Sequence, residues 1–209
     1  MNPPNSREII LDRAMKRFSE KGYDAVGVHE IASAAEVKKP TLYYFFHSKE
    51  GLFRAIMETY YEPFLEQLQS VCRYQAHPSI YEQDVLPLLT NVLRFSIQYA
   101  GQNPEFYRLM ISLIYAPPVS LLRPVYVPYR HRYEQIFVRM FETIAQAHPN
   151  LKGKESQIAV SLMGTIHANI AAMIDETIND QPIRAEWKRE DGEKRSREIV
   201  HQFMHGIFV

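Results

Sequence analysis

Lysine, threonine and aromatic side chains crowd into the stretch KKPTLYYFF, which begins at Lys38. Lysines attract anions, and aromatic rings exposed at this density usually contact a partner. The stretch and the residues just after it contain four basic residues and one acidic residue. These are Lys38, Lys39, Lys49 and Arg54, and Glu50. The whole chain has 24 basic and 24 acidic residues, so its formal charge is zero and this excess is local. The stretch predicts a site for an anion with flat or methyl-bearing edges.

A helix over residues 39–46 would give the stretch two different faces. Each step along a helix turns the side chain by about 100°, so Leu42 and Phe46 point to one side. We expect that side to pack in the core, and the outer surface to carry Lys39, Pro40, Thr41, Tyr43 and Tyr44. The alternative is an ordinary buried helix, which base rates favour for a lone aromatic run.

The rest of the chain predicts an all-α fold, because apolar residues recur at spacings of three and four almost throughout. Ser6 is the expected cap of the first helix and Gly22 its end. Pro63 lies inside a long helix capped by Ser48 and should kink it. The expected helices cover residues 6–21, 28–35, 39–46, a stretch from 48 onward, 82–101, 104–114, 121–147, 154–179 and 189–208.

Two short helices joined by a three- or four-residue turn predict a helix-turn-helix, whose second helix reads base edges in the major groove of DNA. We expect residues 1–48 to form this three-helix domain. Residues 49–209 should form a larger helical bundle for ligand binding and dimerisation, with the long helix after Ser48 shared by both parts.

The segment FSEKGYDAVGVHEIASAAEVKKPTLYYFFHSKEGLF resembles the DNA-binding domain of the TetR family of bacterial transcriptional regulators, and the resemblance covers residues 6–56. It implies a double-stranded operator, palindromic if two copies bind together. It also implies base contacts near residues 39–43 and phosphate contacts around them. The implied DNA-binding residues are Arg7, Val28, His29, Lys38, Lys39, Pro40, Thr41, Tyr43, Tyr44 and Lys49.

Five positions depart from the family pattern. Val26 and Gly27 stand where the family usually has hydroxyl residues, so a cap for the second helix is missing. Glu36 replaces a glycine that favours a left-handed turn, and Phe45 replaces a common histidine. Gly51 stands where a glutamate would close the capping box begun by the serine at residue 48. These changes leave the core pattern intact and bear on DNA affinity.

The last two long helices are apolar enough to be buried on more than one side. The resemblance implies that they pair with their copies in a four-helix dimer interface. The alternative is a bundle within one chain. The expected interface residues are Ile158, Leu162, Ile166, Ile174, Ile199, Phe203, Met204 and Ile207.

The middle of the chain is rich in aromatic residues, and the resemblance implies an apolar or aromatic ligand held among them. Tyrosine hydroxyls and a histidine would supply the polar contacts. The alternative is a packed core with tyrosines at its rim. The expected pocket residues are Phe95, Tyr99, Phe106, Met110, Tyr129, Tyr133, Phe137, Met163, His167 and Ile170.

Other functions have little support in the sequence. No GxSxG, HExxH, P-loop or GxGxxG motif occurs, so we expect no enzyme activity and no cofactor. Glu198, His201 and His205 share a helical face but lack further ligands, so no metal is expected. A single cysteine, Cys72, and no signal peptide or membrane span predict a cytoplasmic protein. The rival interpretations are a helical small-molecule-binding protein or enzyme without DNA binding, and a protein-interaction adaptor.

The expectation is thus a homodimeric, ligand-responsive transcriptional regulator, most simply a repressor that a small apolar or aromatic molecule releases from its operator. Such a release requires only that the ligand bind better to the form that does not fit DNA.

Overall fold

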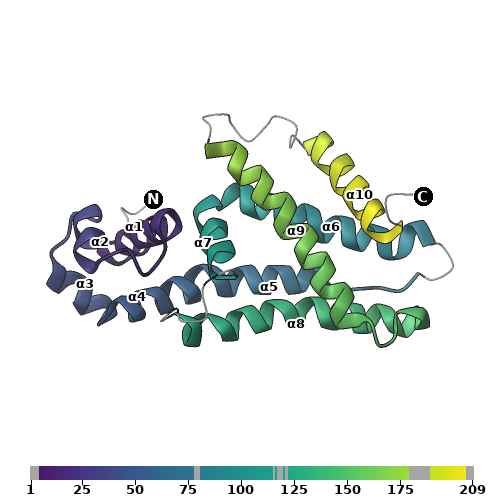
Figure 1. Cartoon of the computed structure of the whole chain (residues 1–209), viewed down its shortest axis with the longest axis horizontal. Helices are drawn as coiled ribbons and strands as arrows, with labels where there is room; N and C mark the ends of the chain where they lie inside the picture. The colour runs from purple at the N-terminus through teal and green to yellow at the C-terminus, as the bar shows by residue number, and fades with distance from the viewer. Residues whose placement is uncertain are drawn as a thin grey trace. The chain divides into compact units, whose positions relative to one another are not determined.

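The computed structural model describes residues 5–77, 81–114, 116, 120, 122–178 and 189–205, and Figure 1 traces them. These residues form helices and contain no strand, which confirms the predicted all-α class. The α-helices are α1 Ser6–Lys21, α2 Val28–Ala34, α3 Lys39–Phe46, α4 Lys49–Ile56, α5 Glu62–Val71, α6 Tyr81–Gln102, α7 Pro104–Ile114, α8 Arg123–Ala147, α9 Glu155–Ile178 and α10 Arg189–His205.

The chain divides into two compact units, of which the first comprises residues 1–64 and 103–130. Within it, α1 packs against α2, α3, α4 and α7. The buried face of α1 carries Ile10, Ala14 and Phe18, as the apolar spacing predicts. Phe18 contacts Tyr23 and Phe53, with ring centroids 5.1 and 6.3 Å away. This core holds α2 and α3 at the surface of the unit.

The ends of α1 are set by two local features. Asn5, and not the expected Ser6, is the cap, because Asn5 has the extended backbone that a cap requires. Its Oδ1 accepts the Glu8 N–H (3.0 Å), and the Glu8 carboxylate accepts the Asn5 N–H (3.3 Å), which completes a capping box. At the other end Gly22 has a φ of 78°, a conformation in which a Cβ would be strained.

The long helix after Ser48 is interrupted by a π-helical turn, Met57–Tyr61, between α4 and α5. Pro63 lies two residues after the end of this turn. Proline has no N–H to donate, and its ring crowds the carbonyl four residues earlier. The Glu62 N–H bonds to the carbonyl of Met57, five residues back, so the widened turn absorbs the disturbance that the sequence predicts as a kink.

The second unit comprises residues 65–102 and 131–209, and in it α6 packs against α9 and α10. Its core is formed by large side chains such as Phe137, Ile144 and Ile170, all fully buried. The expected domain boundary between residues 48 and 49 stays a prediction. No described helix has the length and apolar character needed to cross a membrane.

Candidate nucleic-acid interface

The two faces of α3 differ as the sequence predicts. Leu42 and Phe46 are buried, with 0% and 3% of their surface exposed. Tyr43 and Tyr44 are exposed by 45% and 76%, which is unusual for large aromatic residues on a folded domain. The alternative of a helix buried on all sides is therefore wrong. The outer face is a rigid surface, since the opposite face is fixed in the core.

The beginning of α3 is an exposed, positively charged end of a helix. Lys38 has the extended backbone of a cap but offers no side-chain hydrogen bond to the first turn, and Pro40 has no N–H. The Thr41 N–H bonds back to the Lys38 carbonyl (2.9 Å). Lys38 and Lys39 are exposed beside this end. Lysine ammonium groups and the positive end of the helix dipole together favour an anion here.

A tight turn connects the other end of α3 to α4. His47 has a φ of 62°, and the Ser48 N–H bonds to the Phe46 carbonyl (2.6 Å) across it. Ser48 caps α4 as predicted, because its Oγ accepts the Gly51 N–H (2.9 Å). A Cβ at Gly51 would overlap the Phe46 carbonyl oxygen. The departure from glutamate at this position is therefore what allows the helices to come so close.

The turn between α2 and α3 contains the second unusual backbone. Glu36 has a φ of 55°, the left-handed conformation that the glycine of the family pattern would favour at this place. The cap of α2 is Gly27, which makes no side-chain hydrogen bond, and Val26 is fully buried instead of offering a hydroxyl. Phe45 is half-buried, with its ring 5.1 Å from that of Tyr44. The expected absence of a cap on α2 is confirmed.

Two cations brace the first unit by lying over aromatic rings. The Lys49 Nζ is 4.0 Å from the centre of the Tyr23 ring, and the Arg7 guanidinium carbon is 5.6 Å from that of Phe46. Burial lowers the pKa of Lys49, while the nearby Asp24 carboxylate opposes this shift. The family resemblance implied that Arg7 and Lys49 bind DNA, and it did not predict their contacts with the rings. The positions of Tyr23 and Phe46 beside these cations become known only from the folded structure.

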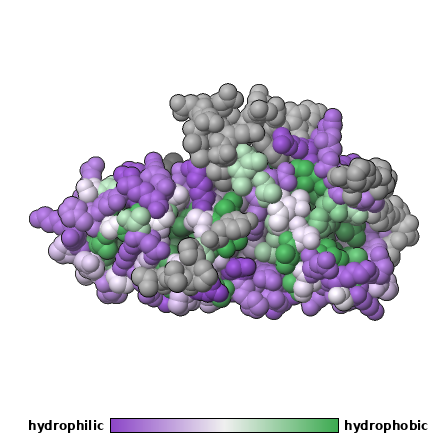
Figure 2. All heavy atoms as spheres, in the orientation of Figure 1, coloured by the Kyte–Doolittle hydropathy of each residue, from purple (hydrophilic) through white to green (hydrophobic). Residues whose placement is uncertain are grey.

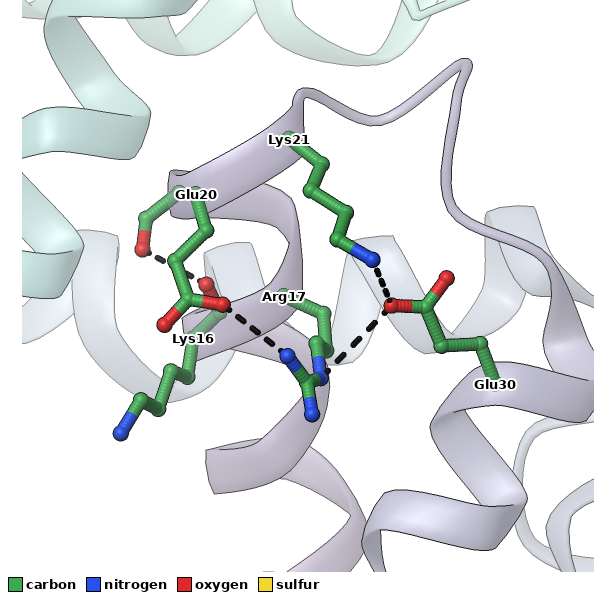
Figure 3. Close-up of polar contacts among 6 residues, drawn as sticks. Lys16, Arg17, Glu20, Lys21 and Glu30 are labelled. Carbon is green, nitrogen blue, oxygen red and sulfur yellow. Dashed lines mark hydrogen bonds and ion pairs between the residues drawn. The ribbon is translucent and has the colours of Figure 1, made fainter.

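Ion pairs hold α2 against α1, as Figure 3 shows. Glu30 of α2 lies 2.6 Å from the Lys21 Nζ and 3.7 Å from the Arg17 Nε, and Arg17 also pairs with Glu20 at 3.2 Å. The hydrogen bond from Lys21 lowers the pKa of Glu30. Between 32% and 50% of each side chain is exposed, so solvent weakens the pairs, and they orient α2 more than they stabilise it.

The structure thus brings most of the predicted DNA-binding residues to the surface of one small domain. Arg7, His29, Lys38, Lys39, Pro40, Tyr43 and Tyr44 are exposed, and Val28, Thr41 and Lys49 are half-buried. Their assignment to DNA stays a prediction.

The predicted ligand-pocket residues fall in both compact units. In the first unit, Tyr61 contacts Phe106 and Tyr129, at centroid distances of 5.6 and 5.5 Å. Met110 is buried in the same unit. Sequence reasoning did not include Tyr61, because its place at the end of the π-helical turn was not foreseen.

In the second unit, Tyr133 and His167 form a buried pair. The Tyr133 hydroxyl and the His167 Nε2 are hydrogen-bonded at 3.1 Å, and their rings are stacked. Burial lowers the pKa of His167 to about 4. Phe137 and Ile170 are buried, Met163 is half-buried, and the rings of Phe95 and Tyr99 are 5.8 Å apart. A ligand cavity among these residues stays a prediction.

The predicted dimer residues divide by exposure. Leu162 and Ile166 are exposed by 1% and 0%, so they belong to the core of the chain itself. Ile158, Ile199, Phe203 and Met204 are half-buried. The side chain of Ile174 and all of Ile207 lie outside the described residues. The exposed face of α9 carries Val160, Ser161, Gly164, Ala168, Ala171 and Ala172.

Comparison with known proteins agrees with this geometry. Residues 10–56 match the model of the bacterial regulatory proteins of the tetR family. The chain is 45% identical over 58 residues to the HTH-type transcriptional repressor ComR of Escherichia coli strain K12. That match spans 28% of this chain and 28% of ComR, so less than a third of ComR is covered.

Two solved structures share the fold of the whole chain. A TetR family transcriptional regulator, PfmR from Thermus thermophilus, is 20% identical with a TM-score of 0.71, covering 99% of this chain and all of PfmR. The transcriptional regulator FadR from Bacillus subtilis, solved in complex with stearoyl-CoA, is 18% identical with a TM-score of 0.69, covering 95% and 98% of the two chains. Residues 10–56 thus match the helix-turn-helix region of the tetR family, and the chain as a whole shares the fold of solved TetR family regulators.

Proposed function

We propose that this chain is a homodimeric transcriptional repressor that binds operator DNA through α3 and leaves it when a small ligand binds. The observation that carries the proposal is the outer face of α3, where two exposed tyrosines and two lysines stand on a helix fixed by its buried side. ComR, which is 45% identical to this chain over 58 residues, is named an HTH-type transcriptional repressor, and this supports the proposal.

In the proposed complex α3 enters the major groove. Lys39, Thr41 and Tyr43 then lie near base edges, which a helix can reach there. Tyr44 and Lys38 face the sugar-phosphate backbone, and the start of α2, with His29, lies along the neighbouring phosphates. Phosphate contacts would supply most of the affinity and base contacts the sequence preference.

The proposed dimer uses the exposed face of α9. Val160 is 56% exposed, and the glycine and alanines that share its face would let a second helix come close. On the side drawn in Figure 2, pale and green residues of low polarity lie over α9 among more hydrophilic ones. We call the helix-turn-helix domain of each copy, expected over residues 1–48, its head. Two heads one helical turn of DNA apart, about 34–36 Å, can read a palindromic operator that one head would bind weakly.

The proposed release from DNA on ligand binding rests on the thermodynamic coupling of the two binding events. A ligand that binds better to the form with the heads out of register weakens DNA binding by the same factor that DNA weakens ligand binding. The fold neighbour FadR was solved with stearoyl-CoA, which supports an apolar group as part of the effector. We also propose that the protein works in the cytoplasm and has no catalytic activity.

A salt titration tests the proposal. Fluorescence anisotropy would measure binding to a library of duplexes cut from the source genome, at about 50 to 300 mM salt. We expect selective binding to a few palindromic fragments, with an affinity that falls steeply as salt rises, because bound cations are released from the phosphates. Equal affinity for all fragments, or none at low salt, would overturn the repressor assignment.

A further inference from the structure

A groove runs between α5 and α8 inside the second compact unit. Residues from α5, from the segment after it and from the second half of α8 enclose a volume of about 700 Å³. In Figure 1, α5 and α8 run alongside each other over this part. The floor is apolar, with Leu65, Cys72 and Met140 buried and Ile136 half-buried. The groove lies outside the aromatic set that the sequence predicts as the ligand pocket.

Cationic side chains surround this apolar floor. The cationic residues of the lining are Arg73, Arg132 and Arg139, and Glu66 is its acidic residue. Arg132 and Arg139 are seven residues apart on α8, so they lie on one face about 10 Å from each other along the axis. Within the described residues, neither Arg73 nor Arg139 forms an ion pair. Arg73 and Arg139 therefore bring positive charge to the groove beside its apolar surface.

The end of the groove is held by a buried polar cluster. Tyr74, which also lines the groove, donates its hydroxyl hydrogen to Asp84 Oδ1 (2.6 Å). Asp84 also accepts the His77 N–H (2.9 Å) and contacts His148 Nε2 (2.5 Å). Burial raises the pKa of Asp84, but hydrogen bonds from His77, Tyr74 and His148 outweigh it and lower the pKa overall. This cluster fixes the segment that carries Arg73.

The apolar floor of the groove adds no charge to that of the arginines. Burial raises the pKa of the Cys72 thiol to about 12, so this side chain stays neutral. A ligand that matches the groove therefore needs an apolar body and an anionic end. Guanidinium groups hold carboxylates and phosphates through paired N–H donors better than they hold other groups.

We propose that this groove binds an amphipathic anion, with its acyl or similar apolar chain along Leu65, Ile136 and Met140 and its carboxylate or phosphate held by Arg73 and Arg139. That this ligand is the effector rests on the proposed repressor function; that it binds here does not. The groove thus adds an anionic group to the apolar or aromatic effector expected from the sequence.

Calorimetry on the full chain without DNA tests the site directly. The probes are palmitate, which has a carboxylate, palmitoyl-CoA, which has phosphates, and dodecyl maltoside, which has a chain and no charge, each below its micelle concentration. We expect one or both anions to bind and the maltoside to bind at least tenfold more weakly. Which anion binds identifies the head group. Failure of both anions, or equal binding of the maltoside, would overturn the proposal.

Two variants and a control locate the binding. Arg73→Gln and Arg139→Gln should each weaken anion binding about tenfold, because each removes a charge-assisted hydrogen bond. Arg130→Gln, at an exposed arginine of α8 outside the groove, should leave it unchanged. Because the replaced residues are exposed, thermal unfolding should stay as in the parent chain. Equal losses in all three variants, or none, would refute the location.

Two further readouts separate this site from the repressor function. In light scattering, the Arg73→Gln/Arg139→Gln double variant should have the same oligomeric state as the parent chain. A changed oligomeric state would mean that a second copy of the chain fills the groove, and would overturn the proposal that an amphipathic anion binds there. Anion binding that leaves DNA affinity unchanged would retain the site and end its role as effector site. DNA binding without any anion binding would retain the proposed repressor function and end the proposed site.

Discussion

The carbonyl oxygen of Phe46 occupies the space in which a side chain at Gly51 would begin. This contact joins the last residue of the proposed reading helix to the first turn of α4. The same junction contains the left-handed His47 and the cap from Ser48. The orientation of α3 on the rest of the first unit therefore depends on a residue without a Cβ.

We expect Gly51→Ala to destabilise the chain, although alanine normally favours a helix by about 1 kcal/mol over glycine. The added methyl group must push the Phe46 carbonyl aside, which should lower the free energy of unfolding by about 1–3 kcal/mol. Urea unfolding followed by circular dichroism measures this. Gly101→Ala in α6, where a Cβ meets nothing within 4 Å, is the control and should be neutral or stabilising. Equal behaviour of the two variants would contradict the steric explanation.

The opposite result is expected at Glu36. Its φ of 55° strains a residue that has a Cβ, and glycine relieves this strain. Glu36→Gly should raise the free energy of unfolding by about 0.5–1 kcal/mol. Glu142→Gly, at an exposed position inside α8, should lower it by a similar amount. A loss of stability in Glu36→Gly would show that its side chain makes a contact worth more than the strain.

Much of the fold could be predicted because its signals are local. Apolar spacing and Gly or Pro residues placed nearly every helix end within a few residues, and the 100° step correctly separated Leu42 from Tyr44. The cap at Asn5 was missed because two adjacent residues can both cap a helix. The π-helical turn before Pro63 was missed because a proline indicates a disturbance without fixing its form.

The site was harder to predict where it depends on packing between distant segments. Periodicity showed that one face of α9 is apolar, but not whether Leu162 and Ile166 meet their own chain or a copy of it. The groove was missed although Arg132, Ile136 and Arg139 have helical spacing, since the opposite wall comes from α5, about 65 residues earlier. The Lys49 contact with Tyr23 has the same origin.

Two substitutions in the head should separate phosphate contacts from base contacts. Lys38→Ala should weaken binding to all duplexes alike and reduce the slope of log affinity against log salt by about 1. Thr41→Ala should instead change the preferred base at one position, by about tenfold in relative affinity. Anisotropy on single-base operator variants at several salt concentrations distinguishes them. If both variants bind like the parent, α3 is not the reading helix.

The exposed face of α9 can be tested through the oligomeric state. Ala168→Glu places a charge among small residues, and an unpaired charge in a packed interface should shift the equilibrium from dimer to monomer by at least tenfold. Sedimentation velocity measures the two species. Ala25→Glu, at an exposed alanine in the head, is the control and should stay dimeric. A dimer that survives Ala168→Glu would place the interface elsewhere.

The buried pair of Tyr133 and His167 should make stability depend on pH. The pKa of His167 is about 4 in the folded chain and 6.5 as the ordinary value, so the unfolded chain binds more protons between these values. Stability from this residue is complete above pH 6.5 and is lost as the pH falls toward 4, by about 2 kcal/mol at pH 5. His167→Gln cannot titrate and should lack this fall, while His131→Gln, at an exposed histidine, should retain it. Urea unfolding at pH 7 and pH 5 decides, because an equal fall in all three proteins would assign the pH dependence to other groups.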